Sequence, residues 1–511
     1  MSKFIKFRVG GVQQWMLIIA PLISLFIILF ADLDPENKKV TYTFAIAFLM
    51  AAWWITEAIP LAVTALIPVV LFPLLGVVDG KTISALYFNH VIFLFIGGFL
   101  MAFAMERWNL HRRIALRILI LFGVSPGRIL MGFMLSTAFL SMWMSNTATA
   151  MMMVPIAFSI ILKLEESLGV EKLGKYSIGL LLAIAYSASI GGIATLVGTP
   201  PNLSFVRISN IIFPQMAEIS FADWFIFALP VTILLFISAW LILYLMYKPR
   251  KKWDNISIHD FKSEYKLLGK PKSEEKVVFV LFVLLVIMWI FRSEIVIQSF
   301  VIPGWEKLFS HPGFINDGTV AIFFGVLLFI LPSKSKKGER LMNWETAGKI
   351  PWGIVLLFGG GFALAQGFVD SGLSLWFGEQ LAGLANVEPM VLTLANASLI
   401  SVLTELTSNV ATTEMILPIL AGLAVTIKIN PLLLMIPATL ASSLAFMLPV
   451  ATPPNAIIFG TNRLQVKDMV KTGILLNLIG IIIVTLVMYF WGTLVFGIDV
   501  SVFPDWAVTG K

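Results

Sequence analysis

Two short polar segments of this 511-residue chain share one pattern. Residues 145–149 read Ser-Asn-Thr-Ala-Thr and residues 408–412 read Ser-Asn-Val-Ala-Thr, and each is followed further along by Thr-Pro-Pro-Asn, at 199–202 and 452–455. Hydroxyls, carboxamides and the carbonyls left free beside a proline are hard oxygen ligands that suit a small cation, with sodium as the natural candidate. Unpaired amides at the start of a half-helix suit a carboxylate, sulfate or phosphate. Polar, helix-breaking residues placed twice within apolar sequence are typical of a transporter with a binding site near the bilayer midplane.

The segments that carry these motifs are expected to be membrane helices. The chain is 59% hydrophobic and 13% charged, and its mean hydropathy is +0.93. Apolar runs repeatedly approach the roughly 20 residues that a spanning helix needs. Because hydrocarbon offers no hydrogen-bond partners and the runs lack the alternation of barrel strands, the sequence predicts an all-α polytopic membrane protein embedded in the lipid bilayer.

Composition also limits the chemistry. The chain has no cysteine, and its four histidines lie far apart in the sequence and outside the repeated motifs. A histidine or cysteine metal centre, or a hydrolase or transferase site, needs a convergent set of such groups, so we expect no enzyme activity. The formal net charge of +7 indicates basic cytoplasmic loops in a membrane protein, and no nucleic-acid motif accompanies it.

Basic loops set the predicted orientation of the spans. We expect the protein to lie in the plasma membrane. Lys3, Lys6 and Arg8 predict a cytoplasmic N-terminus, and the last span then leaves the C-terminus outside the cell. Residues 107–128 carry five arginines and are predicted to form a basic, amphipathic, interfacial stretch. We expect about eleven transmembrane helices, near 15–31, 41–55, 59–77, 88–105, 177–213, 223–247, 277–291, 318–332, 351–368, 432–462 and 472–495.

Two apolar segments and two spans depart from simple helices. Residues 129–162 are too many for one ordinary span and too few for two with a loop, and small polar residues interrupt them, so they predict a re-entrant hairpin. Residues 391–427 predict a second one. Because proline removes an amide donor and clashes with the preceding turn, spans 177–213 and 432–462 must be broken at their Thr-Pro-Pro-Asn motifs.

One ungapped register relates the two hairpins. Asn409 minus Asn146 gives an offset of 263, whereas the Thr-Pro-Pro-Asn copies need an offset of 253. An odd number of predicted crossings separates the hairpins, so the copies should have opposite orientations, as in the inverted-topology repeats of many secondary transporters. The predicted divisions are a first repeat with the N-terminal scaffold helices at 1–247, a cytoplasmic linker at 248–276 and a second repeat at 277–511.

With Ser-Asn-Thr and Ser-Asn-Val hairpin motifs, each followed by Thr-Pro-Pro-Asn, the chain resembles the divalent anion:sodium symporter family, which includes sodium-coupled dicarboxylate and citrate transporters. The stretch from Trp53 to Pro60 also looks like that family's early segment. The likeness spans almost the whole chain. It implies a homodimer in which a scaffold domain holds the partner subunit, while a transport domain of hairpins and broken helices moves across the membrane by an elevator mechanism.

Carried over by motif position, the resemblance implies two sodium sites with an anion between them. The implied ligands of one sodium ion are Ser141, Ser145, Asn146 and the carbonyl of Gly198, and those of the other are Thr404, Ser408, Asn409 and the carbonyl of Ala451. The implied anion contacts are Asn146, Thr147, Thr199, Pro200, Asn409, Val410, Thr452 and Pro453. Val410 cannot supply the hydroxyl that Thr147 offers, so the two ends of the anion site are expected to differ.

The leading functional prediction is sodium-coupled import of a small di- or tricarboxylate, such as succinate, malate or fumarate, with citrate as a further candidate. Sodium-independent exchange of dicarboxylates and symport of sulfate or another divalent anion remain as alternatives. A passive channel fits broken helices and inverted repeats less well.

Single serines and threonines in membrane helices often serve only to join helices. The repetition of Asn146 and Asn409 argues against that role for these two residues. Glu57, Glu405 and Glu414 are costly if buried near the midplane and are therefore functional candidates by default. Structural partner, interfacial group and proton or cation sensor all remain open for them.

Overall fold

A computed structural model of the chain describes residues 11–123, 125–249, 259–297 and 300–508. The residues on which the predicted cytoplasmic N-terminus depends, Lys3, Lys6 and Arg8, lie outside these ranges. Part of the predicted linker, residues 250–258, lies outside them as well.

The described part of the chain before residue 248 folds into helices joined by short connections. Their bounds are α1 (Val12–Phe30), α2 (Lys38–Thr56), α3 (Leu61–Thr64), α4 (Ile67–Leu74), α5 (Gly80–Leu86), α6 (His90–Arg107), α7 (Leu110–Phe122), α8 (Pro126–Ser141), α9 (Asn146–Leu168), α10 (Val170–Leu173), α11 (Tyr176–Ile193), α12 (Pro200–Ile212) and α13 (Phe221–Tyr247).

The rest of the described chain is also helical, apart from one small antiparallel strand pair in which Ile295 faces Ile302. The bounds are α14 (His259–Leu267), α15 (Ser273–Ile290), β1 (Ile295–Ile297), β2 (Phe300–Ile302), η1 (Trp305–Leu308), η2 (Pro312–Phe314), α16 (Asp317–Ile330), α17 (Trp344–Ala347), α18 (Trp352–Ser371), α19 (Leu373–Gln380), η3 (Ala382–Asn386), α20 (Pro389–Leu403), α21 (Asn409–Thr426), α22 (Leu432–Ala441), α23 (Pro453–Phe459), α24 (Val466–Val487), the π-helical turn η4 (Met488–Gly492), α25 (Thr493–Val495) and η5 (Asp505–Ala507).

Many of these helices are long and apolar enough for the membrane. Nine stretches in the described ranges meet that description, and they are Val12–Phe30, Lys38–Thr56, Gly80–Arg107, Asn146–Glu166, Tyr176–Ile193, Phe221–Tyr247, Trp352–Ser371, Asn409–Thr426 and Val466–Val495. Their outer faces keep large apolar side chains exposed, as on α1 at Trp15, Phe26 and Phe30, which suits contact with lipid better than with water. The predicted class, an all-α polytopic membrane protein, is confirmed.

Several apolar helices of the described ranges are shorter than a span, including α16 with 14 residues and the first arms of the predicted hairpins. The first arms of the two hairpins, α8 and α20, have 16 and 15 residues, or roughly 24 Å and 23 Å at 1.5 Å per residue. The hydrocarbon core is about 30 Å thick. Because each arm ends at a motif and the chain then turns into the second arm, α9 or α21, these helices end before they could cross the bilayer.

The predicted single span at 59–77 is instead two short helices, α3 and α4. The break exposes the Ala65 carbonyl, which accepts a 2.5 Å hydrogen bond from the Tyr87 hydroxyl. A methyl group at Gly360 of α18 would lie 2.5 Å from the same carbonyl oxygen. Tertiary contacts with Tyr87 and with a glycine of α18 therefore hold the break, which lies just before Pro68 in the first turn of α4.

The basic stretch at 107–128 runs from the end of α6 through α7 to the start of α8, and arginines of α7 contact the middle of the chain. Arg113 is buried, and its Nε donates to Glu275 at the start of α15 over 2.5 Å. Arg112 pairs with Glu264 of α14 at 3.1 Å. The linker is thus fastened to α7 by one ion pair from its described helix and one from the start of α15.

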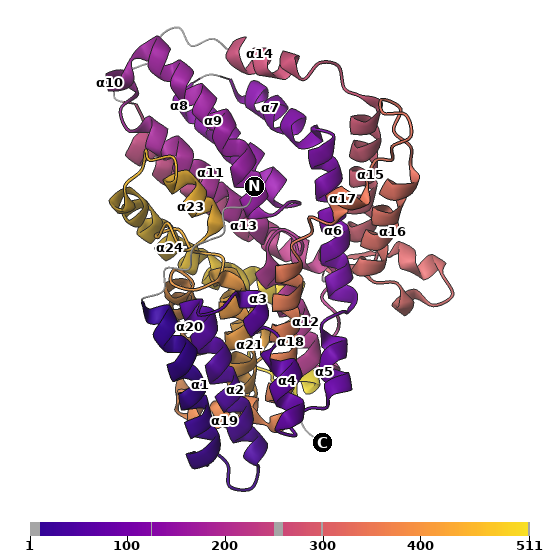
Figure 1. Ribbon diagram of the computed structural model, residues 1–511, viewed down its shortest axis with the longest axis vertical. Coiled ribbons are helices and arrows are strands. Elements are labelled where there is room, and N and C mark those ends of the chain that lie inside the picture. The colour runs from indigo at the N-terminus through magenta and orange to yellow at the C-terminus, as the bar shows by residue number, and fades with distance from the viewer. Residues whose placement is uncertain (1–10, 124, 250–258, 298–299, 509–511) are drawn as a thin grey trace.

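Helix packing follows the same scheme in both halves of the chain. In the first half α11 packs against α8, α9 and α13, and in the second half α22 packs against α20, α21 and α24. The halves also exchange partners, since α9 packs against α23 and α12 packs against α21. In Figure 1, α8 and α9 occupy the upper half of the molecule and α20 and α21 the lower half. The two motifs therefore approach the middle from opposite ends.

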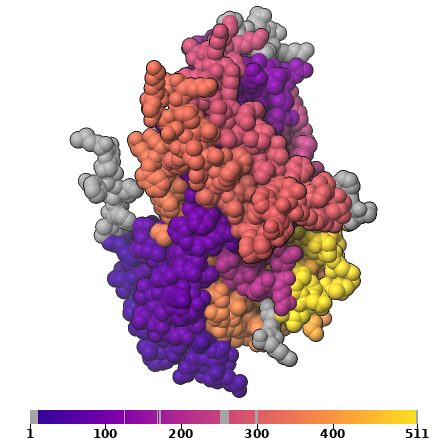
Figure 2. All heavy atoms as spheres, turned by 90° about the vertical axis from the view of Figure 1, so that its right-hand side faces the viewer, coloured from indigo at the N-terminus to yellow at the C-terminus, as the bar shows by residue number. Residues whose placement is uncertain are grey.

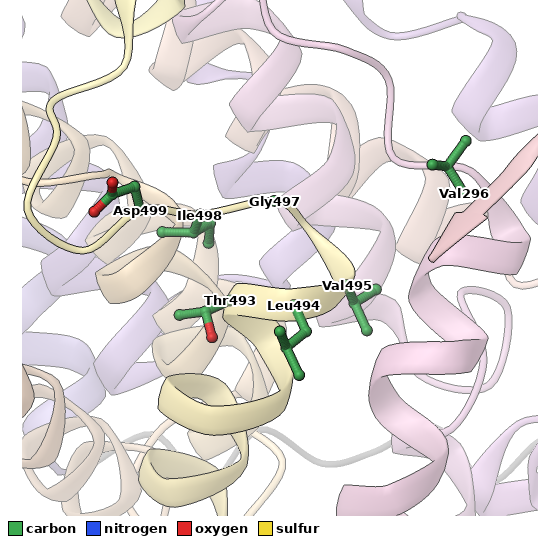
Figure 3. A pocket seen from close by; sticks show the side chains of 7 residues that line it. All are labelled: Val296, Thr493, Leu494, Val495, Gly497, Ile498 and Asp499. Atoms are coloured by element: carbon green, nitrogen blue, oxygen red, sulfur yellow. The ribbon is translucent and has the colours of Figure 1, made fainter. Parts of the chain in front are cut away.

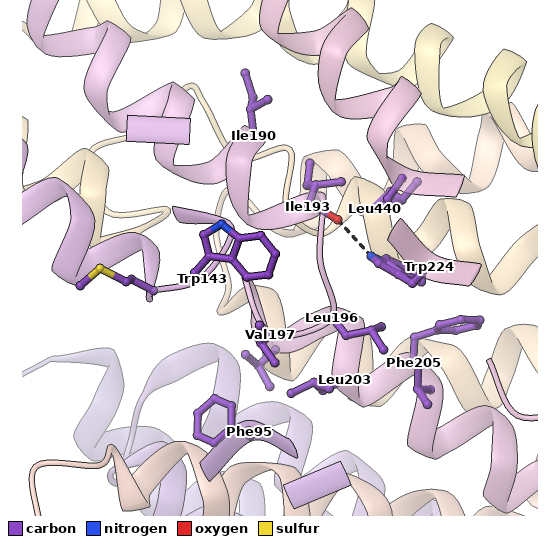
Figure 4. Packing of buried hydrophobic residues seen from close by; sticks show 14 of the residues in the cluster. Phe95, Trp143, Ile190, Ile193, Leu196, Val197, Leu203, Phe205, Trp224 and Leu440 are labelled. Carbon is purple, nitrogen blue, oxygen red and sulfur yellow. Dashed lines mark hydrogen bonds between the residues drawn. The ribbon is translucent and has the colours of Figure 1, made fainter. Parts of the chain in front are cut away.

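A buried aromatic and aliphatic cluster encloses the break between α11 and α12. Figure 4 shows Trp143, Val197 and Phe95 gathered beside this segment, and Trp224 donating a 3.1 Å hydrogen bond to the Ile193 carbonyl at the end of α11. Figure 2, a view onto the right-hand side of Figure 1, shows residues after the linker covering the middle of that face, with the N-terminal helices below them. The broken segment is thus inside protein, where non-helical backbone is tolerated.

Candidate functional site

Each hairpin turn is closed by a hydrogen bond from a hydroxyl to a carboxamide. In the first hairpin the Ser141 hydroxyl donates to Asn146 Oδ1 over 2.6 Å. In the second, the Thr404 hydroxyl donates to Asn409 Oδ1 over 2.7 Å. Ser141 and Thr404 are fully buried, and both pairs obey the offset of 263. Each bond joins the last turn of one hairpin arm to the first residue of the next, so it fixes the direction of the asparagine side chain.

The hydroxyls are also tied to the broken helices. Ser141 Oγ lies 2.7 Å from the Ala188 carbonyl oxygen of α11, and Thr404 Oγ1 lies 2.6 Å from the Ser442 carbonyl oxygen at the end of α22. A hydroxyl has one proton, which each carbonyl and its neighbouring carboxamide therefore share. The hydroxyl, carboxamide and carbonyl oxygens of each half are hard ligands of the kind that bind a small cation.

The last residue of each Thr-Pro-Pro-Asn motif closes its own helix break. Asn202 Nδ2 donates to the carbonyls of Gly192 and Thr195, at 3.3 and 2.8 Å. In the second half the Asn455 Nδ2 donates to the carbonyls of Ala445 and Leu448, at 3.0 and 2.9 Å. All these partners are related by the offset of 253. Both asparagines are fully buried, and they satisfy carbonyls that the broken helices leave free.

Glycines bring the first turn and the first break together. A methyl group at Gly192 would lie 2.6 Å from Asn146 Oδ1 and 3.2 Å from the Gly198 carbonyl oxygen. At Gly198 it would lie 2.5 Å from the Gly192 carbonyl oxygen. The structure therefore brings three of the predicted ligands, Ser141, Asn146 and Gly198, close together.

The second break is organised by a carboxylate instead. Glu405 follows Thr404 and is 2% exposed. Its two carboxyl oxygens accept hydrogen bonds from the backbone amides of Met447 and Leu448, at 2.8 and 3.0 Å, and Asn477 Nδ2 of α24 adds one at 2.9 Å. The offset of 263 pairs Glu405 with Met142, which has no carboxyl group. The charge is thus held beside the segment that leads to Ala451.

The remaining predicted cation ligands have local partners. Ser145 Oγ accepts from the Ala148 amide and caps α9 over 3.2 Å. Ser408 precedes α21, and Ala451 lies in the second break, where its amide donates to the Leu448 carbonyl. Among the hydrogen bonds of the described ranges, none joins Ser145, Ser408 or Ala451 to the two hydroxyl–carboxamide pairs.

The predicted anion contacts lie at the starts of helices. Asn146 and Asn409 are the first residues of α9 and α21, and Pro200 is the first residue of α12. The first turns of α9 and α21 direct unpaired amides and the positive end of the helix dipole toward the motifs. α12 begins with Pro200 and Pro201, which have no N–H, so its start offers the helix dipole without those two amides. Thr199, Val410 and Thr452 are buried, Thr147 and Pro200 are half-buried, and Pro453 is exposed.

The three carboxyl candidates differ in burial. Glu57 is exposed at the end of α2, where its φ of 49° is left-handed. Glu405 and Glu414 are buried. The free-energy cost of burying a carboxylate, which made Glu57 a candidate, therefore does not apply to Glu57. It does apply to Glu405 and Glu414.

The described surface also has a cavity away from the motifs. A space of about 580 Å³ lies between β1 and the C-terminal end of the last helix, and it is lined by Val296, Thr493, Leu494, Val495, Gly497, Ile498 and Asp499 (Figure 3). Its walls are mainly aliphatic, and its one carboxylate, Asp499, accepts hydrogen bonds from the Ser501 hydroxyl and amide. It contains none of the repeated residues, so we locate the candidate site at the motifs.

The chain is similar to known membrane transporters over most of its length. The chain matches the family model described as "Sodium:sulfate symporter transmembrane region" over residues 12–498. It is 44% identical over 491 residues to a sodium-dependent dicarboxylate transporter, SdcS, of Staphylococcus saprophyticus, which covers 95% of this chain and 92% of that protein. The SdcS of Staphylococcus aureus strain NCTC 8325 is 45% identical over the same shares. These relatives are transporters, not enzymes.

Two solved structures share the fold. The Alcanivorax borkumensis YdaH transporter aligns with a TM-score of 0.55 at 14% identity, over 83% of this chain and 88% of that one. The Neisseria gonorrhoeae MtrF efflux pump aligns with a TM-score of 0.57 at 13% identity, over 82% and 84%. At such identities the likeness concerns architecture alone.

Proposed function

Because this chain belongs to the sodium:sulfate symporter family, the divalent anion:sodium symporters that its motifs resemble, we propose that it imports small di- or tricarboxylates by sodium-coupled symport. The substrates we expect are succinate, malate and fumarate, with citrate as a further candidate. The observation that carries the proposal is the pair of hydroxyl–carboxamide hydrogen bonds, Ser141 to Asn146 and Thr404 to Asn409, each beside a proline-broken helix. The names of the staphylococcal relatives support the dicarboxylate and the sodium dependence.

Two sodium ions would bind at the two half-sites. Oxygen atoms from Ser141, Ser145, Asn146 and Gly198 form the first proposed site, and those from Thr404, Ser408, Asn409 and Ala451 form the second. Sodium binding would let each hydroxyl turn its proton toward one acceptor and offer a lone pair to the ion. The close approach of Gly192 and Gly198 to Asn146 supports the first site.

The anion would lie between the two half-sites. Neither motif contains a lysine or arginine, so a dianion would depend on amides, hydroxyls and the two cations for charge compensation. This dependence gives sodium coupling a physical basis, since the anion binds well only after the cations have bound. The proposed contacts are Asn146, Thr147, Thr199, Pro200, Asn409, Val410, Thr452 and Pro453.

The movement we propose is of the elevator type. The hairpins and broken helices would move as one body against the N-terminal helices, α6, α16 and α18, which would form the scaffold of a homodimer. The repeated packing scheme and the hairpins at opposite ends of the molecule support an inverted repeat. We propose a cytoplasmic N-terminus and an external C-terminus, on the basis of the distribution of basic loops.

Uptake into liposomes tests the proposal. The purified full-length protein should accumulate labelled succinate when an inward sodium gradient is imposed. A tenfold gradient supplies about 1.4 kcal/mol per ion, so two ions per dianion would support an accumulation of up to ~100-fold at zero membrane potential. The control replaces sodium by potassium at equal ionic strength, and equal uptake in potassium would sink sodium symport.

The same assay separates the alternatives. Uptake that requires succinate inside the liposomes and does not depend on sodium would identify an exchanger. The family model's description mentions sulfate, so sulfate symport is the second candidate. It predicts sodium-driven uptake of labelled sulfate that unlabelled succinate does not inhibit, whereas the dicarboxylate proposal predicts inhibition of succinate uptake by fumarate and malate but not by sulfate.

A further inference from the structure

A carboxyl group in the second hairpin lies outside the cation and anion sites described above. Glu414 is on α21, five positions after Asn409, and its side chain is 0% exposed. The Ser204 hydroxyl of α12 donates to its Oε1 over 3.0 Å. Its other oxygen, Oε2, is buried without a hydrogen-bond partner. The equivalent residue of the first hairpin, Met151, is 58% exposed, so the carboxyl is a special feature of the second hairpin.

The backbone of α18 closes the space around this carboxyl. A methyl group at Gly361 would overlap the carboxyl carbon and Oε2 of Glu414. The carboxyl thus lies where α21 meets both α12 and α18. In the proposed elevator movement, α21 and α12 slide along α18, so Glu414 is at the sliding surface.

No cation neutralises the group in the described ranges. Tyr87 is the titratable neighbour that interacts with it electrostatically, but the Tyr87 hydroxyl donates to the Ala65 carbonyl. Arg207 of α12 interacts with Glu218 instead. The other titratable groups on the helices packed against α21 are Asp370 of α18, Glu379 of α19, and Lys38, Lys39 and Tyr42 of α2; α22 has none. No lysine, arginine or histidine of the described chain forms an ion pair with Glu414.

An ionised carboxylate in this position would be very unfavourable. Moving an unpaired carboxylate from water into a dry interior is so costly that such groups bind a proton instead. A sodium ion is a poor substitute here, because it needs several oxygen ligands and the site offers a carboxyl and one serine. An ionisable residue within a membrane helix is a functional candidate by default.

We propose that Glu414 is a proton-binding site of the transporter, which must be occupied for α21 to pack against α12 and α18. When movement of α21 opens the site to water, a hydronium ion gives its proton to the carboxylate: one O–H bond of hydronium breaks, the O–H bond of the carboxyl forms, and a water molecule is left. The reverse transfer to water follows when the site opens again. This inference rests on the proposed function, because it concerns the movement that carries sodium and substrate.

The proposal predicts how pH acts on transport. As the pH rises past the midpoint of the site, the fraction of protonated Glu414 falls about tenfold per pH unit. Sodium-driven succinate uptake by the wild type should fall in parallel at alkaline pH. Glu414→Gln keeps the shape and the hydrogen bond to Ser204 but cannot ionise, so its uptake should change less than about twofold over the same range.

Infrared spectroscopy gives a readout that does not need transport. The wild-type protein should show the carbonyl stretch of a buried protonated carboxylic acid at neutral pH, and the band should be missing from Glu414→Gln. Glu379→Gln is the matched control, because Glu379 is an exposed carboxyl on α19, which also packs against α21. That control should keep both the band and the pH profile of the wild type.

The outcomes are distinct. Identical infrared spectra of the wild type and Glu414→Gln, or identical pH profiles of their uptake, would overturn the proton site. A band specific to Glu414 in a protein without sodium-driven succinate uptake would leave the proton site standing and sink the proposed function. If Glu414→Gln does not fold, Glu414→Met replaces it, since Met occupies the equivalent position of the first hairpin, and the same two readouts apply.

Discussion

The two half-sites make the same hydrogen bonds with different surroundings. Both join a hydroxyl to an asparagine at the hairpin turn, and both close the neighbouring helix break with a buried asparagine amide. Around the first, Gly192 and Gly198 allow backbone and carboxamide to approach closely. Around the second, the equivalent positions are Ala445 and Ala451, and a carboxylate holds the break.

This difference indicates how each half-site keeps its geometry. The first is shaped by the absence of side chains on two glycines, so it depends on close contacts that an added methyl group would prevent. The second is shaped by three hydrogen bonds to Glu405, so it depends on a charge and its donors. Substitutions of the same kind should therefore have unequal effects in the two halves, except at the two asparagines that the halves share.

The largest effect is expected where the half-sites are alike. Asn146→Ala and Asn409→Ala should each abolish sodium-driven succinate uptake, because each removes the carboxamide oxygen that accepts from Ser141 or Thr404. Uptake into liposomes measures this, with Ser398→Ala on the exposed face of α20 as the control that keeps activity. An active Asn409→Ala variant would show that the second half-site is misplaced.

The next effect should separate the halves. Gly198→Ala places a methyl group 2.5 Å from the Gly192 carbonyl oxygen, and overpacking of this kind costs about 1–3 kcal/mol. We expect the apparent sodium affinity of uptake to fall roughly 5- to 150-fold. The reverse change in the other half, Ala451→Gly, removes a methyl group and should stay within about threefold. Equal losses from both substitutions would remove the distinction between the half-sites.

The turns and the helix breaks could be predicted from the sequence, but the contacts that close the breaks could not. The Ser-Asn and Thr-Pro-Pro-Asn motifs locate the turns at 142–145 and 404–408 and both helix breaks, because proline and interrupted apolar runs act locally. The roles of Asn202 and Asn455 were missed, although both stand in the motif, since only the fold shows that their amides reach back to Gly192 and Ala445.

Other features depend on packing between segments far apart in the chain. The apolar run at 59–77 was predicted as one span although Pro68 stands in the first turn of α4, and the break is stabilised by Tyr87 and Gly360. The buried states of Glu405 and Glu414 arise from contacts with α24 and α18. A signal for the close approach beside Asn146 was present in Gly192 and Gly198, but glycines in membrane helices usually mark helix packing.

A smaller effect should follow from the charge that only the second half has. Glu405→Gln keeps one oxygen acceptor and places an NH₂ group against one of the backbone amides, leaving a buried donor unsatisfied. A cost of about 1.4 kcal/mol, near the low end for such a group, corresponds to roughly tenfold weaker apparent sodium affinity. The measurement is the sodium dependence of uptake, with the thermal midpoint in detergent as a check on folding.

The matched control is the equivalent position of the first half. Met142→Leu conserves volume and polarity, so we expect it to leave sodium affinity within about twofold of the wild type. An unchanged sodium dependence in Glu405→Gln would mean that the carboxylate does not shape the second half-site, and the contrast with the glycine-lined half would then depend on Gly192 and Gly198 alone.

The smallest expected effect is on the affinity for the anion, and it compares the two ends of the anion site at a single hydroxyl. Thr147 and Val410 have the same shape, but only Thr147 carries a hydroxyl. Thr147→Val should weaken the binding of succinate by about 0.5–1.5 kcal/mol, the usual net contribution of a hydrogen bond. This corresponds to a KM for succinate that is roughly two- to tenfold higher. Val410→Thr adds a hydroxyl at the other end and should change the ratio of citrate to succinate uptake, because the extra carboxylate and hydroxyl of citrate would reach that end.

The swapped double variant, Thr147→Val with Val410→Thr, tests whether the two ends are equivalent. If it restores the wild-type KM for succinate, the two ends are equivalent for a symmetric dianion, and the difference between them matters only for asymmetric substrates. If it retains the loss of Thr147→Val, the anion is held against the first half-site, and the glycine-lined side sets its affinity.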